Sequence, residues 1–188
     1  MRVCIKPLNW VLGVCLLLWT QIVVADFSIH FAETRLVDEV YLLDAKLRYT
    51  LSEATLEALH NGIALTLELT ILIERERWYL WDKTVAKLKQ GYQLKYQALS
   101  GQYRVKYLNT GIEENFASLE TALTKLGHLR DLPLIDKHLI EPEGNYWIYL
   151  QIHLDIESLP VPLRPLAYLS SQWRLSSDWY LCPLPPPQ

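Results

Sequence analysis

Residues 63–73 alternate between apolar and mostly polar side chains, and this pattern constrains the fold more than any other feature of the chain. The apolar side chains stand at the odd positions Ile63, Leu65, Leu67, Leu69, Ile71 and Ile73. A period of two residues puts odd and even positions on opposite faces of a β-strand. The pattern therefore predicts a strand with one buried and one solvated face, in a fold built on a sheet.

Two further segments, residues 92–98 and 103–107, alternate in the same way, with tyrosines on the apolar side. Two tight turns would align all the apolar faces: Asp82-Lys83, which sets Ile73 opposite Tyr92, and Ser100-Gly101, which sets Tyr96 opposite Val105. The sequence thus predicts a three-stranded antiparallel meander over residues 63–108, with a bulge near Gly91.

More strands and two short helices are predicted around this meander. The strands alternate at residues 27–32, 41–49 and 146–156. Each helix has a capping residue before it and a glycine after it, Ser52 with Gly62 and Asn115 with Gly127. Six or more strands with hairpin connections predict a mainly β fold, either an antiparallel β-sandwich or an open barrel, with two short helices.

The N-terminus is typical of a secretory signal peptide. Basic Arg2 and Lys6 precede an apolar run at residues 8–19, and Val23 and Ala25 stand at the two positions that a signal peptidase recognises. We expect cleavage after Ala25 and export. The alternative is a membrane anchor formed by the uncleaved segment, although its apolar run is shorter than the ~20 residues of a spanning helix.

The chain is therefore divided into a signal peptide at residues 1–25, a single β-rich domain at 26–182 and a disordered Pro-rich tail at 183–188. Removal of the signal takes away two basic residues and no acidic one, which shifts the formal net charge from −3 to −5. It also leaves Cys182 as the one cysteine. No internal disulfide is then possible, so the fold must depend on its hydrophobic core. Cys182 is expected to be an idle thiol at a frayed end, with an intermolecular bridge as the alternative.

No catalytic, cofactor or metal motif stands out in the sequence. The five histidines are dispersed and have no cysteine nearby, so a zinc site is not expected. Neither Gly-x-Ser-x-Gly nor a glycine-rich phosphate loop occurs among the seven glycines. We therefore expect a non-enzymatic protein without a cofactor. A hydrolase is a further alternative, because a fold can bring distant catalytic groups together.

Residues 83–106 carry six basic side chains and no acidic one, within a chain that is net negative. Five of them would share the outer face of the meander: Lys87, Lys89, Lys95, Arg104 and Lys106. One interpretation is a solvated face with cross-strand ion pairs, for example Lys89 with Glu76. The other is a docking surface for an acidic protein or for anionic lipid headgroups. Export and net negative charge both disfavour nucleic acid as a partner.

The meander also predicts an unusual hairpin tip. Its residues are Arg75, Arg77, Trp78, Tyr79 and Trp81. An unbroken strand would bury both arginines, which is costly without ionic partners. A bulge, a twist or a tip that projects beyond the core would avoid this cost. A projecting tip with this composition would be typical of an interaction hot spot.

Three segments carry a family resemblance: Tyr41-Leu-Leu-Asp-Ala-Lys, Ala58-Leu-His-Asn-Gly-Ile63 and Trp173-Arg-Leu-Ser-Ser-Asp-Trp179. With the N-terminal signal, they make the chain similar to the proteobacterial exported family labelled domain of unknown function 4390. The resemblance implies a Gram-negative periplasm as the destination and assigns no catalytic residue. Because members are often encoded near a sensor kinase, it also implies an accessory role in envelope signalling.

The leading hypothesis is a non-enzymatic periplasmic interaction module, which would use the basic face or the hairpin tip against an acidic partner such as the ectodomain of a sensor kinase. The alternative is a carrier or sensor of an apolar small ligand. Its pocket would lie between the sheets and would be lined by Tyr92, Tyr96, Tyr103 and Tyr107.

Overall fold

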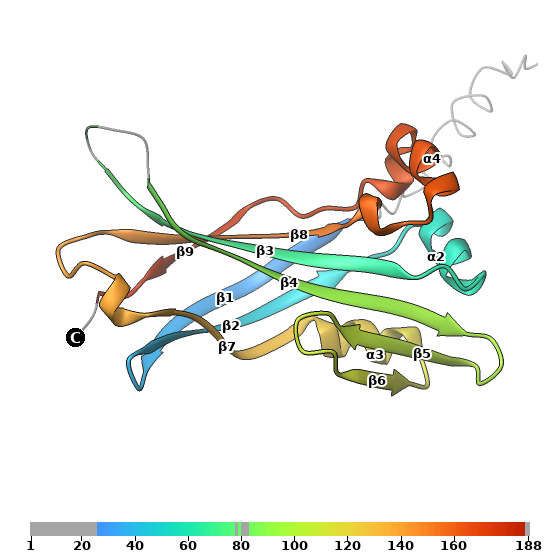
Figure 1. The fold of residues 1–188 in the computed structure, drawn as a ribbon, viewed down its shortest axis with the longest axis horizontal. Helices are drawn as coiled ribbons and strands as arrows, with labels where there is room; N and C mark the ends of the chain where they lie inside the picture. The colour runs from blue at the N-terminus through green and yellow to red at the C-terminus, as the bar shows by residue number, and fades with distance from the viewer. Residues whose placement is uncertain (1–25, 78, 80–82, 187–188) are drawn as a thin grey trace, which may run out of the picture.

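The computed structural model describes residues 26–77, 79 and 83–186 and consists of two antiparallel sheets packed against each other (Figure 1). The small sheet has the order β1 (Phe27–Val37), β2 (Val40–Tyr49), β7 (His128–Asp136). The large sheet has the order β6 (Glu113–Phe116), β5 (Gln102–Tyr107), β4 (Lys83–Gln97), β3 (Leu65–Arg75), β8 (Tyr146–Leu154), β9 (Tyr180–Leu184). No pairing among the described strands closes the sheets into a barrel, so the predicted β-rich fold is confirmed as a sandwich.

The alternating strands bury their apolar faces between the two sheets. The centre of the large sheet is fully buried through Leu65, Leu67, Leu69, Ile71 and Ile73 of β3 and Ile148, Leu150 and Ile152 of β8. The small sheet contributes Tyr41, Leu43, Ala45, Leu47 and Tyr49 of β2. Each large side chain buried in this way stabilises the fold by about 1.5–3 kcal/mol. The buried faces predicted for the segments that form β2, β3 and β8 are confirmed.

The predicted meander is formed by β3, β4 and β5, but both of its registers were wrong. Ile73 pairs with Ala86 instead of Tyr92, whose partner is Leu67. In the second hairpin, Tyr96 pairs with Tyr103. Both errors are shifts by an even number of residues, which leave every side chain on its predicted face. Alternation could therefore not reveal them.

The turns explain the shifts. β3 ends at Arg75 and β4 begins at Lys83, so their connection is longer than the predicted two-residue turn. The second turn spans residues 98–101, where Gly101 has φ = 66°. The bulge also lies elsewhere: the β3–β4 register shifts between Ile73 and Glu74. Gly91 instead lets the next loop approach, because a Cβ there would lie 2.9 Å from Leu108 Cδ1.

Three α-helices connect the strands in the described part of the chain: α2 (Glu53–His60), α3 (Leu119–Leu126) and α4 (Arg164–Leu169). Ser52 caps α2 as predicted, by accepting a 3.2 Å hydrogen bond from the Thr55 amide. The predicted cap of α3 at Asn115 was wrong. Ser118 is the N-cap, since residues 113–116 pair with β5 as strand β6. α4 was not predicted, because proline usually interrupts a helix; Pro165 lies in its first turn, where proline is tolerated.

The described residues also contain four short 3₁₀ helices: η1 (Lys137–Leu139), η2 (Ile156–Ser158), η3 (Val161–Leu163) and η4 (Ser171–Trp173). Trp173 is buried, as an anchor of the C-terminal segment should be. The large sheet, the small sheet and these helices form one continuous hydrophobic core.

The C-terminal segment corrects two predictions. Residues 180–184 form β9 on the edge of the large sheet, where Cys182 pairs with Ile148 and is buried. The tail therefore does not begin at Pro183, and Cys182 is not frayed. Proline is compatible with an edge strand because one side of such a strand needs no hydrogen-bond donor. Burial also raises the pKa of the Cys182 thiol to about 11, which makes it unreactive at neutral pH.

The predicted signal peptide lies outside the described residues, as do Trp78 and Trp81 of the predicted tip. In the described part of the chain, every helix is too short or too polar to cross a bilayer.

Candidate functional site

The outer face of the large sheet holds all five basic residues that the sequence singled out there. Lys87 pairs across the strands with Leu72, and Lys89 with Thr70. On the next pair of strands Lys95 lies opposite Arg104, and Lys106 lies beside them on the same face. The even register shifts described above leave this shared face intact.

Acidic residues of the same sheet neutralise part of this basic face. Lys89 Nζ lies 2.7 Å from Glu68 Oε1, so the predicted pairing of Lys89 with Glu76 was wrong. Arg104 Nη1 and Lys106 Nζ lie 3.4 Å and 3.5 Å from the carboxylate of Glu113 on β6. Among the described residues, Lys87 and Lys95 form no ion pair. They are the basic groups of the face that remain available to a partner.

An exposed aromatic cluster that was not predicted lies on the same outer face, one strand beyond the Leu72 partner of Lys87. One row across the outer face runs from Lys87 through Leu72 and Tyr149 to Leu181. Trp147 and Trp179 flank the row and are 37% and 42% exposed, and Leu181 is 47% exposed. Large aromatic side chains usually contribute to a core, but the Trp179 ring lies against the outer side of the sheet, 6.5 Å from that of Tyr149.

The described ends of β3 and β4 rise away from the rest of the large sheet (Figure 1). Arg75 ends β3 at the rim of the core, where its Nη1 lies 2.7 Å from Glu141 Oε2. A partnered, half-buried guanidinium avoids the cost of an unpaired buried charge. Arg77 and Tyr79 line a surface hollow of ≈ 490 Å³ beside residues 143–145, and Tyr79 is 64% exposed.

The four tyrosines of the predicted pocket do not line one cavity. Tyr96 and Tyr103 contact each other with tilted rings whose centroids lie 5.0 Å apart, and Nε2 of His60 from α2 lies 2.9 Å from the Tyr103 hydroxyl. Tyr92 and Tyr107 form a separate edge-to-face pair at 5.6 Å. This second pair lines a cleft, and the first pair is closed off by α2.

The cleft, with a volume of ≈ 580 Å³, lies where the two sheets separate beside α3, between β5–β6 and β7 (Figure 1). Its floor is aromatic and aliphatic, with contributions from Tyr92, Leu126 and Leu129. Its rim is mainly basic, through Lys125, His128 and Arg130. The sequence analysis missed this group, although three basic residues within six positions around Gly127 are a signal that could have been noticed.

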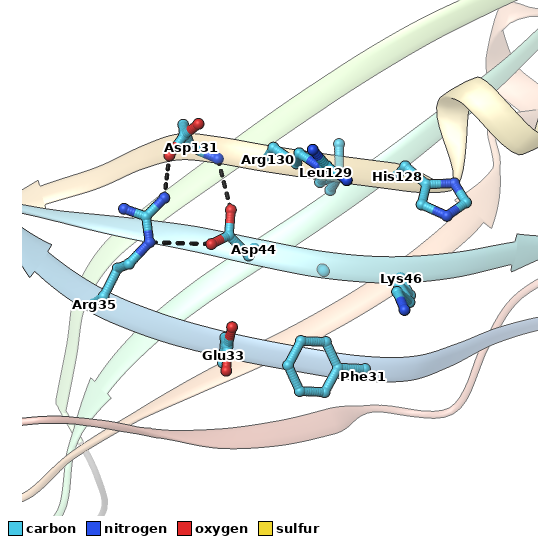
Figure 2. Close-up of a pocket in the computed structure, with 10 residues that line it drawn as sticks. Phe31, Glu33, Arg35, Asp44, Lys46, His128, Leu129, Arg130 and Asp131 are labelled. Carbon is cyan, nitrogen blue, oxygen red and sulfur yellow. Dashed lines mark hydrogen bonds and ion pairs between the residues drawn. The ribbon is translucent and has the colours of Figure 1, made fainter.

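A second groove, of ≈ 410 Å³, crosses the outer face of the small sheet and shares His128, Leu129 and Arg130 with the cleft (Figure 2). At one end Phe31, Lys46 and His128 form a cross-strand row. At the other end polar groups bind one another, so this end has a structural role.

The polar end consists of Arg35, Asp44 and Asp131 (Figure 2). Arg35 Nε lies 3.1 Å from Asp44 Oδ2, and the same guanidinium pairs with Asp131. The Asp131 amide donates a 2.8 Å hydrogen bond to Asp44 Oδ1. Asp131 has φ = 55°, which aspartate tolerates better than most residues, and the network holds this irregular part of β7 in place.

His128 lies at the junction of the cleft and the groove. Its Nδ1 lies 2.7 Å from the Thr124 carbonyl in the last turn of α3; since a carbonyl only accepts, Nδ1 carries the proton. In the neutral ring Nε2 is then an acceptor. No group of three or more His, Cys, Asp or Glu side chains in the described ranges is arranged to hold a metal ion.

These features define a two-sheet β-sandwich domain with an aromatic and basic outer surface and an open cleft between its sheets. Residues 24–183 match the family model described as "Domain of unknown function (DUF4390)", and the chain belongs to this family. Searches of curated proteins and of solved structures found no match.

Proposed function

We propose that this chain is an exported, non-enzymatic interaction module that binds an acidic partner protein through the outer face of its large sheet. The observation that supports this proposal is the position of Lys87, which forms no ion pair among the described residues and lies in one cross-strand row with Leu72, Tyr149 and Leu181. The predicted signal peptide supports a role outside the cytoplasm.

The aromatic cluster would supply the affinity of such a contact. Exposed apolar area of this kind, here from Trp147, Trp179 and Leu181, is typical of an interaction site. Aromatic residues are also enriched at the energetic centres of interfaces. Lys87 and Lys95 would orient the bound partner. Positive groups beside an apolar centre favour a partner whose apolar residues are surrounded by Asp and Glu. The ectodomain of an envelope sensor kinase is the candidate partner that the family resemblance suggests.

Site-specific photocrosslinking in the expressing cell tests this proposal. A photoreactive phenylalanine at Leu181 on the proposed face should yield a defined crosslinked protein. The same probe at Val37, which is 38% exposed at the end of β1, serves as the control. The crosslink at Leu181 should be lost in the double variant Lys87→Glu, Lys95→Glu and kept in Arg48→Glu, which reverses an exposed charge on the small sheet.

Affinity for the captured partner completes the test. Reversal of both lysines should weaken binding by about tenfold or more, and Trp179→Ala by a comparable factor. Equal crosslinking at both probe positions, or unchanged crosslinking in the double lysine variant, would contradict the proposal. Binding to anionic vesicles that the same variants abolish would assign the face to a membrane surface instead.

A further inference from the structure

We infer that the cleft beside α3 binds a small amphiphile with an apolar body and one anionic head group. This site is separate from the outer face of the large sheet, so the inference goes beyond the proposed function. It rests on an open apolar floor, a basic rim and the position of α3.

The cleft opens at the edge of the space between the sheets, above a floor of largely buried side chains. Leu129 points inward from β7, since it pairs with the inward-facing Ala45 of β2. Tyr92 and Leu126 complete the floor and are 5% and 2% exposed. Ile112 forms one wall and is 56% exposed, so an apolar contact remains unfilled there. An apolar ligand body would cover this side chain.

The position of α3 explains why the cleft stays open. Its C-terminal turn is fastened to the small sheet, because the Leu47 amide donates a 2.7 Å hydrogen bond to the Gly127 carbonyl. A Cβ at Gly127 would lie 2.3 Å from the Leu47 carbonyl oxygen, so only glycine permits this approach. α3 buries just Ala122 and Leu126 among its own residues, and the space next to its last turn is left unfilled.

The rim carries an excess of positive charge. Lys125 and Arg130 line the rim and form no ion pair with any described residue. Glu114 is the one carboxylate among the described lining residues. Its carboxylate is hydrogen-bonded to Tyr107. The pKa of Tyr107 is raised by burial and by the charge and hydrogen bonding of Glu114. A carboxylate, sulfate or phosphate head would therefore be attracted to Lys125 and Arg130.

The volume of the cleft favours a small molecule over a protein segment as its ligand. A volume of ≈ 580 Å³ falls within the range of about 300–1,000 Å³ that is usual for small-molecule pockets. The combination of an apolar floor and a basic rim is complementary to a single-chain amphiphile, whose tail covers Ile112 and Leu129 while its head remains at the solvated rim.

A series of ligands with one chain and three head groups tests this inference. The protein is purified in the form that accumulates in the expressing cell. Dodecanoate, dodecanol and dodecyltrimethylammonium are then titrated into it below their aggregation limits, and calorimetry measures binding. We expect saturable one-to-one binding of dodecanoate, binding of dodecanol that is weaker by roughly tenfold, and no binding of the cation. Equal binding of all three ligands would overturn the charge selection.

Two double variants and one single variant locate the site. The double variant Lys125→Glu, Arg130→Glu should weaken dodecanoate binding by roughly tenfold or more, while Lys87→Glu, Lys95→Glu should leave it unchanged. Ile112→Asp places a carboxylate in the apolar wall and should weaken binding of dodecanol as well. All four substituted basic residues are exposed, and unchanged thermal unfolding of each variant verifies its fold. Dodecanoate binding that survives both Lys125→Glu, Arg130→Glu and Ile112→Asp would refute the site.

Discussion

The two seams along which the sheets of this sandwich meet differ in how they are closed. At one seam β9 lies beside β1, and hydrogen bonds cross from the small sheet to the C-terminal segment. The Thr34 hydroxyl donates to the Pro183 carbonyl at 3.1 Å, and the Tyr41 hydroxyl to the Pro185 carbonyl at 2.9 Å. At the other seam β6 and β7 do not pair, α3 lies between them, and the cleft remains.

This difference shows how the closing element determines whether a sandwich has room for a ligand. A strand such as β9 extends the sheet through main-chain hydrogen bonds and can point alternate side chains, here Cys182 and Leu184, into the core. A short helix satisfies its own main-chain groups and covers a seam with one stripe of side chains. The strand therefore seals its seam, whereas the helix leaves the cleft beside its last turn.

The largest expected effect comes from deleting a tyrosine at each seam. Tyr41 is fully buried at the closed seam, so Tyr41→Ala should lower the free energy of unfolding by about 4 kcal/mol. Tyr107 is half-buried at the open seam, and Tyr107→Ala should cost only about 1–2 kcal/mol. Urea unfolding monitored by circular dichroism gives both values. Equal losses would show that the open seam is packed as tightly as the closed one.

The attachment of α3 is tested by Gly127→Ala. The added methyl group meets the Leu47 carbonyl, so we expect a loss of about 2 kcal/mol and a displaced α3. Gly111→Ala is the control: a Cβ there meets no neighbouring atom, and its φ of 74° alone should cost about 1 kcal/mol. Altered dodecanoate binding in Gly127→Ala but not in Gly111→Ala would link α3 to the cleft, and a stable Gly127→Ala variant would contradict the tight approach.

The smallest expected effect comes from the same conservative change at two positions of β2. Tyr41→Phe removes the hydrogen bond to Pro185 and should destabilise the fold by about 1 kcal/mol. The Tyr49 hydroxyl is buried and has no hydrogen-bond partner among the described residues, so Tyr49→Phe should stabilise the fold by up to about 1 kcal/mol. Chemical denaturation of both variants decides the sign, and a loss in Tyr49→Phe would mean that this hydroxyl does find a partner.

The sequence predicted the faces of the strands better than their partners. Alternation correctly identified the buried sides of β2, β3 and β8 and hence a sheet-based core. Alternation does not distinguish registers that differ by an even number of residues, which is why both predicted hairpin registers were wrong. The turns that would have corrected the registers do not follow the short two-residue patterns assumed for them.

Three strands escaped prediction for separate reasons. β6 has only four residues and was assigned to the start of a helix. In β7 the register with β2 shifts between Leu43 and Ala45, which interrupts any simple alternation around Arg130 and Asp131. In β9 the prolines resembled those of a disordered tail. The cleft depends on β6 and β7, so the sequence could suggest a pocket between the sheets beside Tyr92 and Tyr107 but not the basic rim of the cleft.

What the sequence determined by itself was the class of fold, the alternation of buried and solvated faces, the cap of α2 and the family, because each depends on local pattern or on matched residues. The tertiary structure alone decided which acidic groups neutralise the lysines, where the exposed tryptophans gather and where the sheets separate. Those features depend on distances between segments far apart in the chain. Local periodicity contains no information about such distances, because one alternating strand can pair with another in several registers that bury the same side chains.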